Sequence, residues 1–198
     1  MRQVVFLASL IAGVFLLFAG APRYDKWQVI GPGGGGGQFS PTISPHTPDD
    51  VLAACDMTGS FISHDGGESW RMFNLGLRAG FFVFDPVDRR VIYAKTIGPP
   101  AIMAKDRPLS LAGLWRSTDS GRTWRLVRAD PSTSPGSAGV GPAGDLMALA
   151  VDPANSRSLL AVLQEGASSA LYASTDWGRS WSKAGELPGG GQSIDIDP

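Results

Sequence analysis

The stretch Ser117-Thr118-Asp119-Ser120-Gly121-Arg122-Thr123-Trp124 decides the fold, because the chain contains it two more times in closely similar form. The related octapeptides are SHDGGESW at residues 63–70 and STDWGRSW at residues 174–181. The three aspartates are 54 and 57 residues apart, and such a period indicates one supersecondary unit stacked several times. The residues that define the shared pattern are Ser63, Asp65, Gly67, Trp70, Ser117, Asp119, Gly121, Trp124, Ser174, Asp176, Gly178 and Trp181.

The octapeptide has the chemistry of a tight turn between two strands. A short acidic side chain accepts hydrogen bonds from the backbone N–H groups that follow it. Glycine at the fifth position adopts a positive φ at no steric cost, and the closing tryptophan covers the turn with a large apolar face. A turn is needed in every repeat and an active site only once, so we predict structural rather than catalytic aspartates.

Short apolar runs surround each octapeptide, and they predict four strands per repeat. The predicted strands are 39–45, 51–55, 60–62 and 70–73 in the first repeat, 80–86, 90–95, 113–116 and 124–127 in the second, and 147–153, 158–162 and 170–173, followed by Trp181, in the third. Four strands at a period near 55 residues predict an all-β chain, a β-propeller with four-stranded antiparallel blades.

The ring is expected to be incomplete. About three blades fit into residues 22–198, whereas closed propellers have about four or more. Residues 194–198 resemble the start of the third repeat and predict the first strand of a further blade, and residues 27–30 resemble the last strand of a repeat. We predict a truncated ring whose remaining blades come from C-terminal sequence. Assembly from several copies of the chain is the alternative.

The N-terminus has the pattern of a targeting segment. Residues 1–3 give a positive start, residues 4–18 are almost entirely apolar, and Ala19-Gly20-Ala21 predicts a signal-peptide cleavage site. Residues 4–21 are also long enough to span a bilayer as an uncleaved anchor. We therefore expect an exported chain that is periplasmic, secreted or anchored by this segment, with the partial propeller in residues 22–198.

Composition argues against several partners and cofactors. With a net charge of -1, the chain lacks the positive electrostatic field that would attract nucleic acid. Cys55, His46 and His64 are the chain's only cysteine and histidines, so no Cys/His metal site is expected. Residues 31–36 formally match a dinucleotide-binding glycine loop, but the strand-like residues 38–41 follow where that motif needs a helix. No metal or cofactor is predicted.

The less regular stretches, residues 96–111 and 130–144, are predicted to be surface loops. The arginines stand at strand ends and turns and predict a solvated face; they include Arg71, Arg89, Arg90, Arg122 and Arg125.

The octapeptides resemble the Asp-box (BNR-type) repeats of sialidases, sortilin-type receptors, photosystem-assembly propellers and two-propeller xyloglucan endoglucanases. Residues 27–198 are most similar to the first propeller of the last group, which shows a Trp, a glycine run and then Thr-Asp-Ile-Gly-Gly. Here the same order is given by Trp27, by Gly33, Gly34, Gly35, Gly36 and Gly37, and by Cys55-Asp56-Met57-Thr58-Gly59. The sequence departs from the family at Cys55 and Thr58. The Arg-Ile-Pro tripeptide usual in sialidases is absent.

This resemblance implies that Asp56 is one of two catalytic carboxylates. Gly33–Gly37 have no side chains and would leave an open floor for a ligand. Glycoside hydrolysis needs a carboxylate on either side of the bond, and the family carries the second one in its second propeller. The resemblance thus implies the N-terminal part of a glycoside hydrolase acting on a β-glucan-type polysaccharide, inactive as this fragment alone. A non-catalytic binding or assembly propeller, with Asp56 as a simple turn residue, is the alternative.

The position of Asp56 follows from the strand order. It lies between the second and third predicted strands of its blade, whereas the octapeptides lie between third and fourth strands. Consecutive hairpin turns fall at opposite ends of antiparallel strands. We expect Asp56 at the end opposite the octapeptides, near Gly33–Gly37.

Overall fold

The computed structural model describes residues 31–33, 35–57, 59–98, 112–130, 142 and 144–197. These residues form strands and turns and contain no helix, so the prediction of an all-β chain is confirmed. No membrane-spanning helix occurs among them. Gly31–Pro198 forms one compact unit. The predicted targeting segment and the strand at residues 27–30 lie outside the part that the structure describes.

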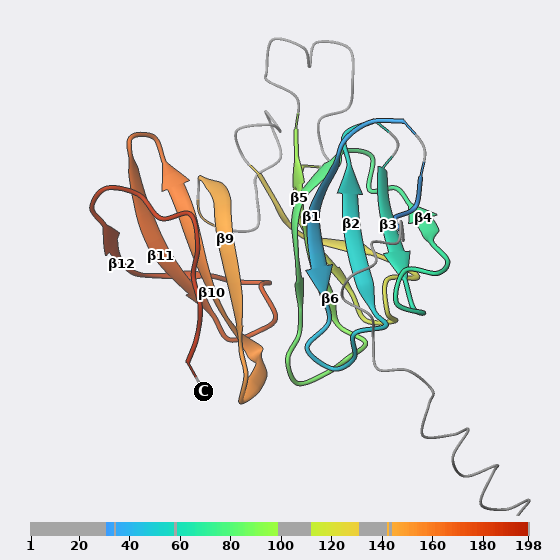
Figure 1. Cartoon of the computed structure of the whole chain (residues 1–198). Helices are drawn as coiled ribbons and strands as arrows, with labels where there is room; N and C mark the ends of the chain where they lie inside the picture. Colours follow the sequence, from blue (N-terminus) through green and yellow to red (C-terminus); the bar gives the residue numbers. More distant parts are fainter. Residues whose placement is uncertain are drawn as a thin grey trace, which may run out of the picture. The chain divides into compact units, whose positions relative to one another are not determined.

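Three four-stranded antiparallel sheets make up the described part of the chain, and in each one the strands follow chain order (Figure 1). The first sheet contains β1 (Gln38–Ile43), β2 (Val51–Cys55), β3 (Gly59–Ser63) and β4 (Arg71–Phe73). The second contains β5 (Arg78–Phe84), β6 (Ile92–Ile97), β7 (Gly113–Ser117) and β8 (Arg125–Ala129). The third contains β9 (Asp145–Asp152), β10 (Asn155–Glu165), β11 (Ser168–Ser174) and β12 (Ser182–Leu187). These sheets are the three predicted blades.

Strand register repeats from blade to blade. The first serine of each octapeptide pairs with one position of the second strand: Ser63 with Val51, Ser117 with Ile92, and Ser174 with Leu159. Counting from these pairs defines equivalent positions in the three blades. Side chains alternate between the two faces of a strand, so equivalent residues lie on the same face of their blades. For example, Ile92 faces the first blade and its equivalent Leu159 faces the second.

The core lies between blades rather than within them. One buried cluster joins Leu52, Ala54 and Ile62 of the first blade to Ile92 and Ala94 of the second, among other residues. The other joins Tyr93 and Leu114 of the second blade to Leu159, Ala161 and Leu163 of the third. Ile92 and Tyr93 are neighbours on β6 yet belong to different clusters, so the alternation of β6 serves both interfaces.

The strands and loops differ from the sequence prediction at the end of the chain and at the borders of the two predicted loops. Residues 193–197 form no strand, because a strand requires a hydrogen-bonded neighbour and none lies beside this segment in the described part. Thr96 and Ile97 belong to β6 rather than to a loop, and Thr96 is fully buried. Asp130, predicted at the start of a surface loop, is also buried.

Candidate functional site

The three octapeptides form three turns with the same hydrogen bonds, and each turn links the third and fourth strands of a blade. In the second blade the Ser117 hydroxyl donates to Asp119 Oδ1 (2.8 Å) and accepts the Gly121 N–H (2.9 Å). Asp119 also accepts the Thr123 N–H (2.8 Å) and the Thr123 hydroxyl (2.6 Å). The equivalent bonds occur around Asp65 and Asp176.

These bonds fix the charge of the three aspartates. Donation from the Ser69 hydroxyl lowers the pKa of Asp65 from 3.8 to about 2, and the Thr123 hydroxyl does the same for Asp119. Burial opposes the shift at Asp176, but hydrogen bonds from Ser180 still lower its pKa to about 2. A carboxylate that stays ionised and uses its oxygens within its own turn is unsuited to proton transfer near neutral pH.

Two consecutive residues of each turn have positive φ, whereas the sequence predicts this only for the glycine. The fourth position is Gly66 (φ 71°) in the first blade, Ser120 (φ 58°) in the second and Trp177 (φ 62°) in the third. Each donates its N–H to a carbonyl in or just before the second strand of the same blade: Asp49 O, Arg90 O and Arg157 O, at 3.0, 2.9 and 3.1 Å respectively. This anchor holds non-glycine residues in a conformation that costs roughly 1–2 kcal/mol.

The turns also join neighbouring blades. Trp124 donates its Nε1–H to Gly121 O (3.1 Å) and stacks on Phe73 of the first blade, with ring centroids 5.1 Å apart. The guanidinium of Arg71 in the first blade donates to the same Gly121 carbonyl (2.8 Å). Trp181 donates its Nε1–H to Gly178 O (2.9 Å) and packs against the cluster between the second and third blades.

Asp56 lies in the β2–β3 turn, at the opposite end of β3 from Asp65. The structure brings its exposed carboxylate against the glycine run, where Oδ1 accepts the Gly37 N–H at 2.9 Å. Gly36 requires its lack of a side chain, because it has φ 96° and an added Cβ would lie 2.5 Å from Asp56 Oδ1. Gly33 and Gly35 have open space around them, and Gly34 lies outside the described residues.

This arrangement supplies one accessible carboxylate beside an open glycine surface. Beside it, the Cys55 thiol lies 3.5 Å from Gly35 O, which ties the turn further to the glycine run. Within the described segments, no group of three or more His, Cys, Asp or Glu side chains is placed to hold a metal ion. The octapeptide aspartates lie at the other end of the strands and take no part in this site. The catalytic role of Asp56 stays a prediction.

Sequence reasoning missed a buried charged cluster that consists of Lys95 on β6, Arg128 on β8 and Asp130. Asp130 pairs with Lys95 and accepts from Arg128 at 2.8 Å, and all three side chains are almost fully buried. Arg128 also donates to Gly144 O at 2.5 Å. Burial lowers the pKa of Lys95 to about 8 and that of Arg128 to about 10. A signal existed: Lys95 occupies the position that Ala54 holds in the first blade.

Comparison with known proteins supports the fold and indicates a relationship. No protein-family model matches the chain. Xyloglucanase Xgh74A of Acetivibrio thermocellus is 29% identical over 184 residues, which cover 87% of this chain and 20% of that protein. The crystal structure of an ancestral GH74 enzyme matches with a TM-score of 0.54 at 22% identity, covering 80% of this chain and 19% of that one. YCF48 from Cyanidioschyzon merolae matches with a TM-score of 0.48 at 19% identity, over 74% and 36% of the two chains.

The architecture and these similarities define the class: the chain is a β-propeller of four-stranded blades. It is similar in sequence to a GH74 xyloglucanase and spans about a fifth of the length of the curated relatives it matches.

Proposed function

We propose that this chain is the part of a glycoside hydrolase that carries Asp56 as one of two catalytic carboxylates, acting on a β-glucan-type polysaccharide such as xyloglucan. The observation that carries the proposal is the place of Asp56, which is exposed and held by the Gly37 N–H beside the glycine run. The similarity to a xyloglucanase supports the substrate class. We propose also that the octapeptides are Asp boxes and that the chain is exported.

The hydrogen bond from Gly37 suits a catalytic carboxylate that must hold one orientation. Oδ1 is engaged by the backbone, and a reacting group must be held close to its productive position to act efficiently. The second carboxylate would come from outside this chain. Its separation from Asp56 would distinguish the two mechanisms, because inverting enzymes need about 6.5–9.5 Å and retaining enzymes about 5–5.5 Å.

Apolar side chains near Asp56 provide contacts for a sugar ring. Phe39 is 43% exposed, and an added Cβ on Gly37 would lie 2.8 Å from its ring, which places this ring next to the glycine run. Met57, the neighbour of Asp56, is 75% exposed. Exposed apolar groups beside a carboxylate are typical of a polysaccharide subsite, since the faces of sugar rings carry C–H groups and their edges carry hydroxyls.

The test is made on the whole protein that contains this chain, with xyloglucan as substrate. Asp56→Asn keeps the size of the side chain and removes its charge. We expect kcat to fall by roughly 10²–10⁴-fold, the usual contribution of an acid–base group, with KM nearly unchanged. The matched control is Asp49→Asn, an exposed aspartate at the octapeptide end of the first blade, which should leave kcat as it is. An unchanged kcat in Asp56→Asn would leave Asp56 as a turn residue.

A non-catalytic binding propeller is the second candidate, and the same hydrogen bond favours it in part. An aspartate that accepts from Gly37 N–H also serves simply to hold the glycine run against the β2–β3 turn. In that case the whole protein would bind polysaccharide without cleaving it, and Asp56→Asn would lower thermal stability and leave binding unchanged.

A further inference from the structure

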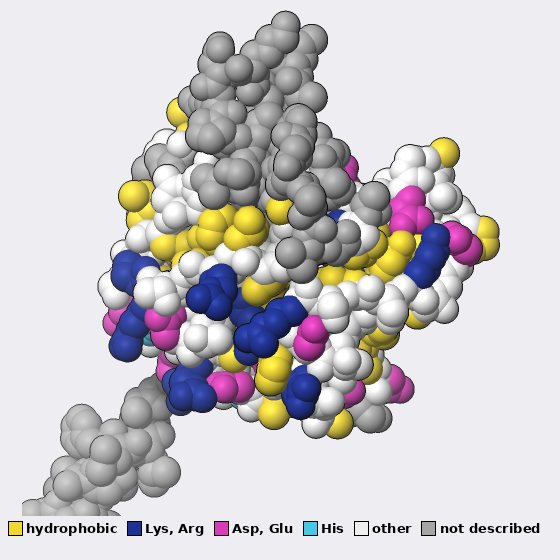
Figure 2. All heavy atoms as spheres, turned by 180° about the vertical axis from the view of Figure 1, so that it is seen from behind, with side chains coloured by type: hydrophobic (Ala, Val, Ile, Leu, Met, Phe, Trp, Pro, Cys, Tyr) yellow, Lys and Arg dark blue, Asp and Glu magenta, His cyan; other side chains and the backbone are white. Residues whose placement is uncertain are grey.

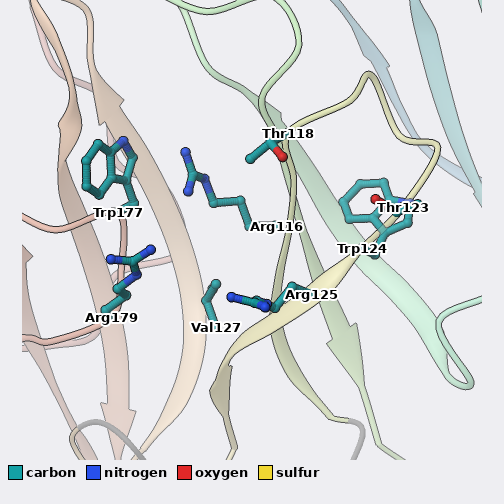
Figure 3. A pocket seen from close by; sticks show the side chains of 8 residues that line it. All are labelled: Arg116, Thr118, Thr123, Trp124, Arg125, Val127, Trp177 and Arg179. Atoms are coloured by element: carbon teal, nitrogen blue, oxygen red, sulfur yellow. The ribbon is translucent and has the colours of Figure 1, made fainter.

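A pocket of about 460 Å³ lies between the second and third blades, at the octapeptide end and away from Asp56. Arg116, Arg125 and Val127 enter it from β7 and β8, and Trp177 and Arg179 from the turn between β11 and β12 (Figure 3). The strands and turns that carry these residues are all within the described ranges. The pocket thus owes its shape to the packing of two blades.

Three arginines lie close to the Trp177 ring, and two of them, Arg116 and Arg179, line the pocket. The guanidinium carbons of Arg116, Arg157 and Arg179 lie 5.5, 4.8 and 5.6 Å from the centroid of the Trp177 ring. Arg116 also lies over the ring of Tyr93, at 5.9 Å. Contacts of this kind attract a cation to an aromatic face and restrict its side chain. Each of these guanidinium groups is therefore restrained by its contact with the same indole ring.

These cations lack acidic partners. Among the residues that the structure describes, none of Arg116, Arg125, Arg157 and Arg179 forms an ion pair, and Arg116 Nε is buried without a hydrogen-bond acceptor. Asp88, whose charge interacts with Arg116, is already paired with Arg90 at 2.9 Å. The net charge of the chain is only -1, and on the face seen in Figure 2 the Lys and Arg side chains are spread over the middle and lower part with Asp and Glu side chains among them.

The gap between the first and second blades shows that this arrangement is not a general property of the repeat. There the equivalents of Arg116 and Trp177 are Ile62 and Ser120. Arg71, the equivalent of Arg125, donates to Gly121 O of the next blade at 2.8 Å. Within the described part of the chain, Arg125 makes no corresponding bond and instead lines the pocket. Between the second and third blades, the guanidinium of Arg125 therefore lines the pocket, whereas Arg71 between the first and second blades forms an interblade hydrogen bond.

We infer that this pocket binds a tetrahedral oxyanion, the sulfate or phosphate group of a ligand. Guanidinium groups donate paired N–H bonds to such oxygens, and several donors can serve one group at once because it carries more acceptor oxygens than a carboxylate. Three lining arginines match two negative charges better than the single charge of a carboxylate. The inference is independent of Asp56, and its success or failure leaves the proposed hydrolase activity untouched.

The experiment is calorimetric titration of the full chain at low ionic strength with inorganic sulfate, inorganic phosphate and acetate. Sulfate and phosphate should bind and acetate should bind more weakly. Arg125→Gln and Arg179→Gln change exposed side chains that the fold does not need, so both variants should stay folded. Each should weaken oxyanion binding by roughly tenfold, the value of one charge-assisted hydrogen bond. Affinity for phosphate should rise with its second ionisation, because the site is proposed to prefer two negative charges, and sulfate, which stays doubly charged, should show no such rise. An affinity for phosphate that does not change with this ionisation would count against the inference.

Arg122→Gln is the matched control, because Arg122 holds the repeat position of Arg179 but belongs to the other gap. It should bind both oxyanions as the wild type does. An equal loss of affinity in Arg122→Gln and Arg179→Gln would show that general surface charge causes the binding and would overturn the inference. Absence of sulfate and phosphate binding at millimolar concentrations, or tighter binding of acetate than of either, would overturn it as well.

Discussion

Removal of Asp130 is expected to cost far more stability than removal of its partner Lys95. Asp130→Ala takes away the carboxylate that faces both Lys95 and Arg128, whose side chains are only 6% and 1% exposed. Leaving buried charges without their partner costs about 3–5 kcal/mol. Asp145 attracts both cations and offsets part of this loss, so we expect a value near the lower end, about 3 kcal/mol.

Lys95→Met, in contrast, is expected to change the free energy of unfolding only slightly. The pair between Arg128 and Asp130 survives at 2.8 Å, and a buried ammonium gives way to an apolar side chain of similar length. Ala54 and Val162 occupy the equivalent position in the other blades, so apolar side chains are compatible with it. Exchange of a buried charge for a packed hydrophobic group is often neutral, and we expect a change within about 1 kcal/mol.

Equilibrium unfolding in urea measures both variants, with the midpoint and slope fitted together. The Asp130→Ala midpoint should fall strongly with an unchanged slope, and its melting temperature should fall by roughly 6–12 °C, from about 2–4 °C per kcal/mol for a chain of this size. Equal losses in the two variants would refute the reasoning, because they would show that the ammonium itself stabilises the fold. A loss below about 1 kcal/mol in Asp130→Ala would refute it too.

The octapeptides give two further predictions. Asp119→Ala should lower the free energy of unfolding by roughly 1–3 kcal/mol, because it removes the acceptor of three hydrogen bonds, while Asp49→Ala, at an exposed aspartate, should change little in the same urea experiment. The folded-state pKa values of Asp65, Asp119 and Asp176 lie below the unfolded value, so their contribution is present above pH 3.8 and is lost as pH falls toward about 2. Acid unfolding followed by circular dichroism should show this loss, and its midpoint should rise in Asp119→Asn. A midpoint that stays in place would contradict the assigned hydrogen bonds.

The strands and turns were predictable because the octapeptide that marks the turn between the third and fourth strands occurs three times. A single Asp-x-Gly turn is a weak signal, but repetition at 54 and 57 residues fixes the period, and the period fixes four strands per blade. The place of Asp56 was predictable for a related reason, since alternating hairpin turns leave it only one end of the sheet. Its closeness to Gly37 follows from the same strand order, because the glycine run precedes the start of β1 and Gln38 on β1 pairs with Cys55 at the end of β2.

The contacts between blades could not be predicted from the sequence, because they depend on which side chains of different blades meet in space. Arg71 and Arg125 hold the same repeat position, yet one donates to a neighbouring carbonyl and the other lines a pocket. The positive φ of Ser120 and Trp177 was missed because neither residue type favours it and the carbonyl that accepts the N–H comes from a distant position of the same blade. Lys95 interrupts an apolar pattern, and this was the one visible signal of the buried cluster.

Unequal contacts between blades have a consequence for the way the chain folds. Three repeats with one shared turn could dock in the wrong order, and misassembly between similar units is a known failure of repeat proteins. The stacked pair of Phe73 and Trp124 is aromatic, whereas the second blade offers buried cations that attract Asp145 of the third. A third blade docked on the first would find Ala54 where Lys95 should be, and Asp145 would lose that cation. We therefore expect the charged cluster to favour docking of the third blade on the second blade rather than on the first.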